Sequence, residues 1–290
     1  MPRSLSANEI FPARSLDISA RIIALRSGLR VRLVEGGPAN GEPVLMLHGW
    51  GASAYGFRHA FDRLGKHGLR VIAADLRGFG LSDKPAAAGA YSLANYREDV
   101  DEMLDALGVE RAFLVGHSMG GGVALQYALA RPDRVRALSL ISPTNLVDIP
   151  LLRVPKLAPR FVARLLGGRL VPRVGIELLL RWVAYGDASL VTDEAVNEYW
   201  APTQFPGYVP AARSSLSEFD WNPITHDHAR SLAVPTVVIL GAHDRLVRGA
   251  LAAARSLRGA SVHELAAGHC VHEALPERAY DIIARHVISR

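Results

Sequence analysis

The sequence predicts an α/β fold in which helices flank a mostly parallel twisted sheet, with a helical segment inserted in the second half. Three observations lead to this prediction. Short continuous apolar runs, the kind buried on both faces of a parallel sheet, alternate with runs at helical spacing. This alternation stops at Ser142-Pro143 and resumes at Pro235. Between these points the chain is rich in leucine, arginine and proline and has no clear strand.

Length and composition agree with one large domain that carries an insertion. A chain of 290 residues with 49% apolar content can bury a full core. Cys270 is the single cysteine, so no intramolecular disulfide can form and nothing indicates an oxidising compartment. The segment from Met1 to Arg21 has no apolar signal-peptide core, and no run of about 18 apolar residues predicts a membrane span. We therefore expect a soluble cytoplasmic protein, either a monomer or a homodimer.

Apolar patterning places the elements of the first half. The expected strands span 21–25, 29–35, 43–47 and 69–74, and the expected helices span 57–64 and 92–107. The first two strands are joined by a turn at Ser27-Gly28, and Gly108 ends the second helix. Because strands and helices alternate from residue 43 onward, we expect parallel strands joined by right-handed crossovers.

The second half contains the insertion and the end of the sheet. The expected strands span 135–141, 235–240 and 261–265, and the expected core helices span 247–257 and 276–288. Residues 146–222 are expected to form a helical cap, and residues 1–145 and 223–290 the core. Prolines limit the cap to short helices, which we expect over 160–166 and 175–185 and from Thr192 onward. Thr192 is a suitable N-cap because acidic residues follow it in the first turn.

The stretch around Ser118 predicts the most distinctive local structure. An apolar run over 111–115 meets Gly-His-Ser-Met-Gly, and an alanine- and leucine-rich run follows at once. The pattern predicts a strand, a sharp turn and a helix, with Gly116 and Gly120 where the turn leaves no room for a Cβ atom. The serine itself should have strained dihedrals, which proteins keep mainly where the strain has a use. Alone the pattern is weak, since a serine that merely caps a helix looks the same.

Two further residues can make this serine reactive. Asp244 follows the strand over 235–240, and His269 follows the strand over 261–265. The carboxyl ends of parallel strands meet at one edge of a sheet, so we expect both residues beside Ser118. An imidazole can remove the serine proton, and a carboxylate can hold the imidazole in the required tautomer. Ser118, Asp244 and His269 are therefore the predicted catalytic triad.

These motifs resemble those of the α/β-hydrolase superfamily, in its esterase, lipase and C–C hydrolase branch with a helical cap. The similar segments are an oxyanion loop at His48-Gly49-Trp50, a nucleophile elbow at 116–120, an acid turn at 241–244, a histidine loop at Gly268-His269 with Glu273 and Pro276-Glu277, and residues 75–85 after the preceding strand. The resemblance implies that the backbone N–H groups of Trp50 and Met119 form an oxyanion hole. Met119 also suits this role because the first N–H groups of a helix are unpaired.

The resemblance implies a cofactor-free serine hydrolase that cleaves carboxylic esters of lipophilic small molecules through an acyl-enzyme. We expect substrate contacts from five residues: His48, Gly49, His117, Trp182 and Tyr185. Ser118 stands where the dehalogenase and epoxide-hydrolase branches have aspartate, so an alkyl-enzyme is not expected. Some relatives place the triad acid after the strand that here ends at Ile141, which leaves Asn145 and Asp148 to be tested.

Two alternative functions stay open. A C–C hydrolase of vinylogous diketones would use the same triad, although those enzymes typically have tryptophan where this chain has Cys270. A ligand-sensing protein on a hydrolase scaffold, such as a hormone receptor, could also keep the triad. Turnover separates the two classes, because a sensor would cleave activated esters slowly and retain the product.

The charge of the cap and the spacing of the histidines indicate which binding partners to expect. The segment from Asp148 to Arg181 has seven basic and two acidic residues. Its excess of five positive charges equals the net charge of the whole chain, +5. Such a cap could contact anionic lipid weakly, but no motif accompanies the charge to predict nucleic-acid binding. His226-x-His228 and the histidines of the loop after residue 268 lack the H-E-x-x-H order, so no metal is expected. We expect the cap to be a lid that favours lipophilic acyl chains.

Overall fold

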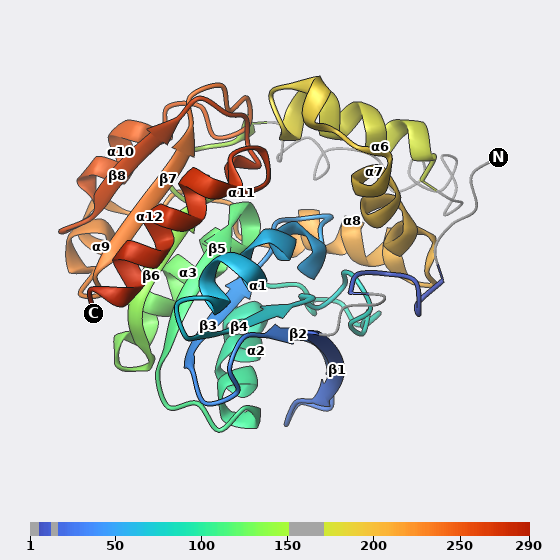
Figure 1. Ribbon diagram of the computed structural model, residues 1–290, viewed down its shortest axis with the longest axis horizontal. Helices are drawn as coiled ribbons and strands as arrows, with labels where there is room; N and C mark the ends of the chain where they lie inside the picture. Colours follow the sequence, from blue (N-terminus) through green and yellow to red (C-terminus); the bar gives the residue numbers. More distant parts are fainter. Residues whose placement is uncertain (1–5, 13–16, 151–170) are drawn as a thin grey trace.

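The computed structural model of the protein describes residues 6–12, 17–150 and 171–290 (Figure 1). Its eight-stranded sheet has the order β1-β2-β4-β3-β5-β6-β7-β8. The strands are β1 (Ile18–Ala24), β2 (Arg30–Gly36), β3 (Glu42–Leu47), β4 (Leu69–Ala74), β5 (Ala112–His117), β6 (Val135–Ile141), β7 (Thr236–Gly241) and β8 (Ser261–Leu265). The pairings of β2 with β1 and with β4 are antiparallel, and every other pairing is parallel. The sheet confirms the predicted fold class.

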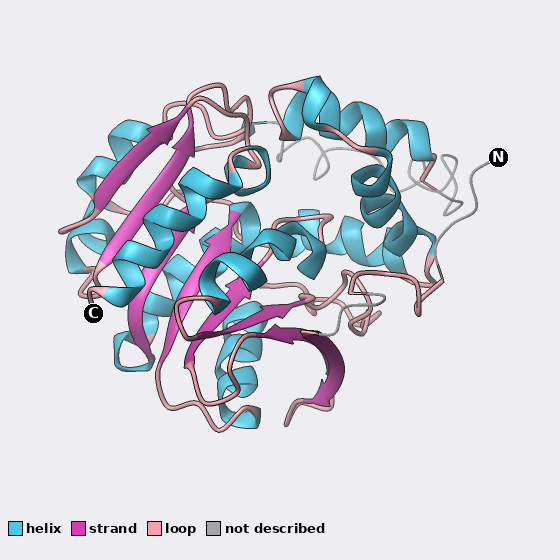
Figure 2. Ribbon diagram, viewed as in Figure 1, coloured by secondary structure: helices cyan, strands magenta, loops and turns pink. Residues whose placement is uncertain are grey.

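Helices cover both faces of this sheet (Figure 2). The α-helices are α1 (Arg58–Gly65), α2 (Leu93–Ala106), α3 (Ser118–Ala130), α6 (Arg173–Leu179), α7 (Asp193–Trp200), α8 (Tyr208–Glu218), α9 (His226–Ser231), α10 (Ala250–Ser256), α11 (Val271–Ala274) and α12 (Pro276–Ile288). Short 3-10 turns span Ala54–Phe57, Pro132–Arg134, Ala188–Leu190 and Ala201–Gln204. One apolar core packs β-strand side chains against α2, α3 and α10, and a second packs them against α1 and α12.

Local sequence accounts for most of these elements. Every residue of β5 and β7 is buried, as expected for apolar runs in the middle of a parallel sheet. The hydroxyl of Ser92 caps α2 by accepting a hydrogen bond from the backbone N–H of Asn95. Thr192, the predicted N-cap, accepts one from Ala195 at the start of α7. These caps satisfy N–H groups that have no partner within the helix.

Two predicted helices differ from the structure. The helix expected over 175–185 is α6 followed by a π-helical turn, Leu180–Ala184. The helix expected to begin at residue 247 begins at Ala250, because Gly249 before it adopts a left-handed φ of 79°. The helix predicted over 160–166 lies outside the described residues. Among the helices of the described segments, none is long and apolar enough to cross a membrane.

The described helices of the cap are α6, α7 and α8, which Figure 1 shows above and to the right of the central strands. Asn145 joins the two ends of the cap. Its side-chain amide donates to the carbonyl oxygens of Asp220 (2.8 Å) and Asn222 (2.7 Å), and its own carbonyl accepts from the N–H of Ile224 (2.7 Å). Asn145 is fully buried with a left-handed φ of 64°. These bonds hold the ends of the insertion together where it leaves and re-enters the core.

Glu198 on α7 connects the N-terminal arm to the cap. Its carboxylate oxygens accept hydrogen bonds from the backbone N–H of Phe11 at 3.0 and 3.2 Å. The carbonyl of Phe11 accepts from the guanidinium of Arg32, and its ring lies edge-on to Tyr55. Burial raises the pKa of Glu198 from 4.5 to about 7, although the Phe11 hydrogen bond opposes this shift.

We expect Glu198→Gln to raise the melting temperature above pH 7 and to flatten its dependence on pH. The folded-state pKa exceeds the unfolded value, so the favourable contribution of Glu198 is complete below pH 4.5 and is lost as pH rises through about 7. The gain at pH 8 should be on the order of 3 kcal/mol, or roughly 5 °C. Thermal unfolding from pH 4.5 to 8 measures it, with the exposed Glu264→Gln as control. Parallel curves for the Glu198 variant and the unsubstituted protein would refute the prediction.

Candidate active site

Ser118 lies at the junction of β5 and α3 with no loop between them. Its φ of 52° is in the left-handed region, the strain predicted for this position. A Cβ atom at Gly116 would lie 2.4 Å from the carbonyl oxygen of Gly120, and one at Gly120 would lie 2.1 Å from that of Leu47. Both glycines are therefore required for the turn, as predicted. They allow α3 to begin directly against the end of β3.

The loop at His48-Gly49-Trp50 crosses directly over this serine. A Cβ atom at Gly49 would lie 3.0 Å from the Cβ atom of Ser118. The Nε2 atom of His48 accepts a hydrogen bond from the N–H of Leu76 at 2.9 Å, so the ring proton is on Nδ1, which donates to the carbonyl of Gly49 at 2.7 Å. Burial lowers the pKa of His48 and keeps it neutral. His48 thus supports the shape of the loop with both ring nitrogens.

The indole of Trp50 connects the same loop to the cap. Its Nε1–H donates to the hydroxyl of Ser215 (2.9 Å) and to the carbonyl of Ala212 (3.1 Å), both on α8. Met119 is the second residue of α3, in the first turn, where backbone N–H groups have no acceptor within the helix. The backbone N–H groups of Trp50 and Met119 belong to the two segments that meet at Ser118.

Asp244 and His269 form the hydrogen-bonded pair that the sequence predicted would meet at this edge of the sheet. The Nδ1 atom of His269 lies 2.8 Å from Oδ2 of Asp244. The other carboxylate oxygen accepts from the N–H groups of Leu246 (2.8 Å) and Val247 (3.2 Å). Burial alone would raise the pKa of Asp244, but the hydrogen bond to His269 and its charge outweigh burial and lower it. Asp244 is therefore ionised near neutral pH and orients the imidazole.

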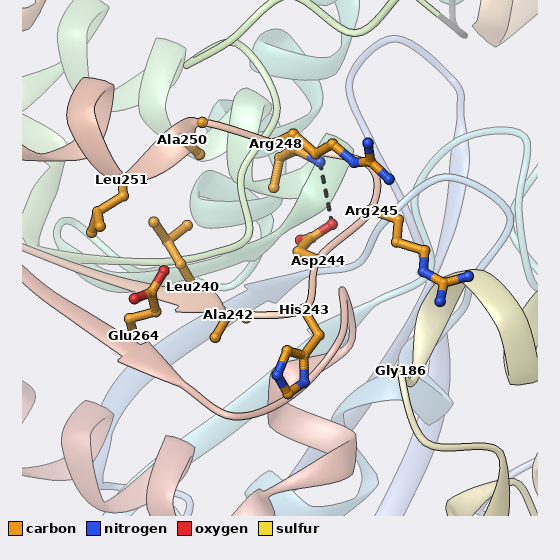
Figure 3. A pocket seen from close by; sticks show the side chains of 13 residues that line it. Gly186, Leu240, Ala242, His243, Asp244, Arg245, Arg248, Ala250, Leu251 and Glu264 are labelled. Atoms are coloured by element: carbon orange, nitrogen blue, oxygen red, sulfur yellow. Dashed lines mark hydrogen bonds between the residues drawn. The ribbon is translucent and has the colours of Figure 1, made fainter.

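The outer side of the acid turn lines an open pocket of about 560 Å³. Figure 3 shows His243, Arg245 and Arg248 on this side. The dashed line marks the hydrogen bond that the backbone N–H of Val247 donates to Asp244. The Asp244 carboxylate itself is buried against His269. The two arginines are exposed and line the pocket together with Asp244.

Three histidine rings pack against one another around His117, the residue that precedes the serine. The ring of His117 is 4.9 Å from that of His269 and 4.5 Å from that of His272, measured between centroids. The Nε2 atom of His117 lies 3.2 Å from the carbonyl oxygen of His269. Burial lowers the pKa of His117 well below its usual range and lowers that of His272 to about 4. Both are therefore neutral near pH 7, and His117 connects the serine turn to the backbone of His269.

The cap residues expected to contact substrate occupy different environments. Trp182 is 59% exposed, and its carbonyl accepts from Arg245 at 3.3 Å. Tyr185 is buried, and its hydroxyl donates to Glu273 at 2.8 Å. Substrate contact by either residue stays a prediction. The sequence did not predict the Tyr185–Glu273 hydrogen bond, although Glu273 belongs to the histidine-loop motif. No sequence signal pointed to Arg58, which pairs with Glu273.

The other acid candidates and the metal-like spacings lie elsewhere. The Asn145 amide donates to the carbonyl oxygens of Asp220 and Asn222, and Asp148 is exposed. His226 and His228 both belong to the short helix α9. Within the described part of the chain, no cluster of three or more histidine, cysteine, aspartate or glutamate side chains is arranged to hold a metal ion.

Comparisons with known proteins give consistent similarities. A family model described as alpha/beta hydrolase fold matches residues 42–275. A 2-hydroxymuconate semialdehyde hydrolase of Pseudomonas putida is 32% identical over 90% of this chain and 90% of its own. A 2-hydroxy-6-oxononadienedioate/2-hydroxy-6-oxononatrienedioate hydrolase of Comamonas testosteroni is 33% identical over 76% of this chain and 77% of its own. The structure of a meta-cleavage product hydrolase from Pseudomonas fluorescens IP01 superposes with a TM-score of 0.79 at 26% identity, covering 95% and 99% of the two chains.

Proposed function

Because the chain belongs to the alpha/beta hydrolase fold family, we propose that it is a hydrolase in which Ser118 attacks a carbonyl carbon and forms an acyl-enzyme. The observation that supports this most directly is the Asp244–His269 hydrogen bond of 2.8 Å, at the same edge of the sheet as a serine in a strained turn. The carboxylate holds the proton of His269 on Nδ1, which leaves Nε2 free to accept the serine proton.

The reaction would proceed in two acyl-transfer steps. The Oγ atom of Ser118 bonds to the substrate carbonyl carbon while its proton passes to His269. The developing oxyanion accepts hydrogen bonds from the N–H groups of Trp50 and Met119, and removing one such donor typically raises the barrier by about 3 kcal/mol. His269 then returns the proton to the leaving group. A water molecule, activated by His269, hydrolyses the acyl-enzyme and restores Ser118.

We favour a C–C bond as the bond cleaved, in a 2-hydroxy-6-oxo dienoate or a related vinylogous diketone. Two relatives named for such chemistry are 32–33% identical over 76–90% of this chain. The dienol must first take its 2,6-dioxo keto form. After Ser118 adds to the 6-oxo carbon, the electron pair of the breaking C–C bond can delocalise through the remaining double bond into the 2-oxo carbonyl. The resulting carbon leaving group is then protonated from His269. This ranking reverses the expectation from sequence alone, which placed esters first.

Ester hydrolysis is the second candidate, supported by Cys270. This residue follows the catalytic histidine where C–C hydrolases typically have tryptophan, and it is buried beside Leu180, Val191 and Val196 of the cap. A tryptophan there would need space that these side chains occupy. The same triad would act, with an alcohol as the leaving group.

A comparison of kcat/KM between the two substrate classes decides between C–C and ester hydrolysis. We expect kcat/KM for a 2-hydroxy-6-oxo dienoate, followed by loss of its absorbance, to exceed that for any p-nitrophenyl ester from acetate to octanoate by about 100-fold. The reverse ranking would establish ester hydrolysis, and kcat/KM should then rise with acyl length, since each buried methylene contributes up to about 0.8 kcal/mol. A single turnover with retained product would instead indicate a ligand sensor.

A further inference from the structure

The cap contacts the histidine loop, residues 267–270, through backbone hydrogen bonds. The N–H of Gly268 donates to the carbonyl of Tyr185 at 3.0 Å, and the N–H of Cys270 donates to the carbonyl of Ala184 at 2.7 Å. These two amides stand on either side of His269. The backbone of the proposed base is therefore held by the cap as well as by the core.

Two glycines allow this close approach. A Cβ atom at Gly186 would lie 2.7 Å from the nitrogen of Gly268, and one at Gly268 would lie 2.5 Å from the nitrogen of Gly186. Gly186 also has a φ of 77°, which favours glycine. The chain segments thus touch backbone to backbone at this point.

The side chain of Tyr185 adds a second contact between the cap and this part of the core. Its hydroxyl donates to Oε2 of Glu273 at 2.8 Å, and this oxygen also accepts from Arg58 at 2.5 Å. The hydroxyl of Tyr199 donates to the other carboxylate oxygen of Glu273, Oε1, at 2.6 Å. Burial alone would raise the pKa of Glu273, but the charge of Arg58 and these hydrogen bonds outweigh burial and lower it. Glu273 is therefore a buried carboxylate, held ionised by its donors.

Glu273 lies in the short helix that directly follows the histidine loop. Its backbone N–H donates to the carbonyl of Cys270 at 3.0 Å, and it lies in α11, which begins at Val271. Tyr185 therefore meets this part of the chain twice, through its carbonyl on Gly268 and through its hydroxyl on Glu273. Arg58 comes from α1 of the core, so the carboxylate is anchored to both the core and the cap.

We propose that Tyr185 is a positioning residue, which couples the seating of the cap to the alignment of His269 through Gly268 and Glu273. This proposal rests on the proposed role of His269 as the catalytic base. Proton transfer between Ser118 and the leaving group requires the imidazole to be placed to within about 0.5 Å, and larger errors cost catalysis rather than binding. A cap that is not seated would leave the histidine loop without its two backbone acceptors.

Tyr185→Phe tests the proposal, with Tyr199→Phe as a matched control. Both variants remove one tyrosine hydroxyl from Glu273, but only Tyr185 also accepts a hydrogen bond from the histidine loop. We expect Tyr185→Phe to lower kcat about tenfold with KM changed less than twofold, and Tyr199→Phe to leave kcat within twofold. The two should lower the melting temperature similarly. In hydrogen exchange, the amides of Gly268 and Cys270 should exchange about tenfold faster in Tyr185→Phe alone.

A double variant supplies a second readout. If Tyr185 acts through Glu273, Tyr185→Phe combined with Glu273→Gln should have no lower kcat than the lower of the two single variants. Equal loss of kcat in the two tyrosine variants, a change in KM alone, or unchanged exchange at Gly268 and Cys270 would overturn the proposal. Failure of the catalytic assignment is distinguishable, because it would appear as turnover retained by Ser118→Ala, whereas exchange at these amides needs no substrate.

Discussion

Ser118→Ala is expected to lower kcat by at least about 10⁴-fold while leaving the fold intact. The nucleophile has no substitute, because the residual rate from the oxyanion hole and binding alone is several orders of magnitude lower. The turn depends on Gly116 and Gly120, whose Cβ positions are blocked by backbone atoms, and not on the serine hydroxyl. The melting temperature should therefore change by less than about 3 °C.

Labelling and a control variant make this result specific. An aryl fluorophosphonate should modify Ser118 alone, as read by mass spectrometry of the digested protein. Cys270 should stay unlabelled, because its burial raises the thiol pKa well above the usual range. The control is Ser139→Ala. Ser139 is a buried serine in β6, the strand next to β5, and this variant should retain full activity. A label on Cys270, or turnover by the Ser118 variant near that of the unsubstituted protein, would contradict the mechanism.

Asp244→Asn is expected to lower kcat by about 10⁴-fold with little change in fold. The asparagine amide can present N–H to Nδ1 of His269, which favours the tautomer that cannot accept the serine proton at Nε2. It also removes the negative charge that stabilises the imidazolium when the proton is transferred. The hydrogen bond of 2.8 Å between Asp244 and His269 is the contact on which this expectation depends.

Asp148→Asn is the matched control for this variant. Asp148 follows β6, the other strand after which a triad acid is found in some relatives, and the structure shows it exposed. Its substitution should change kcat less than twofold. Steady-state kinetics of both variants decide the assignment. Loss of kcat in the Asp148 variant with activity kept in the Asp244 variant would reverse the roles given to the two residues.

Local signals in the sequence were sufficient for the fold class, and they led to the prediction of the three triad positions. The strands over 69–74, 135–141 and 261–265 were predicted with the bounds that the structure has. The first two are mostly buried, mainly apolar runs, whereas β8 over 261–265 is a largely exposed edge strand. The strained φ of Ser118 followed from the glycines beside it, since steric exclusion acts over a few neighbouring residues. The meeting of Asp244 with His269 followed from chain order, since parallel strands end at one edge.

Contacts between distant segments were decided only in the tertiary structure. Arg58 and Glu273 are 215 positions apart, and neither has a neighbour that identifies the other as its partner. A buried charge must find an opposite charge and donors, but sequence alone does not say which of many arginines supplies them. The π-helical turn at 180–184 and the backbone contact of Tyr185 with Gly268 likewise arise from packing of the cap on the core. Sequence therefore predicted which groups could do the chemistry. Packing between segments determined what holds the backbone of His269 in place, because such packing depends on shape that no short stretch of chain encodes.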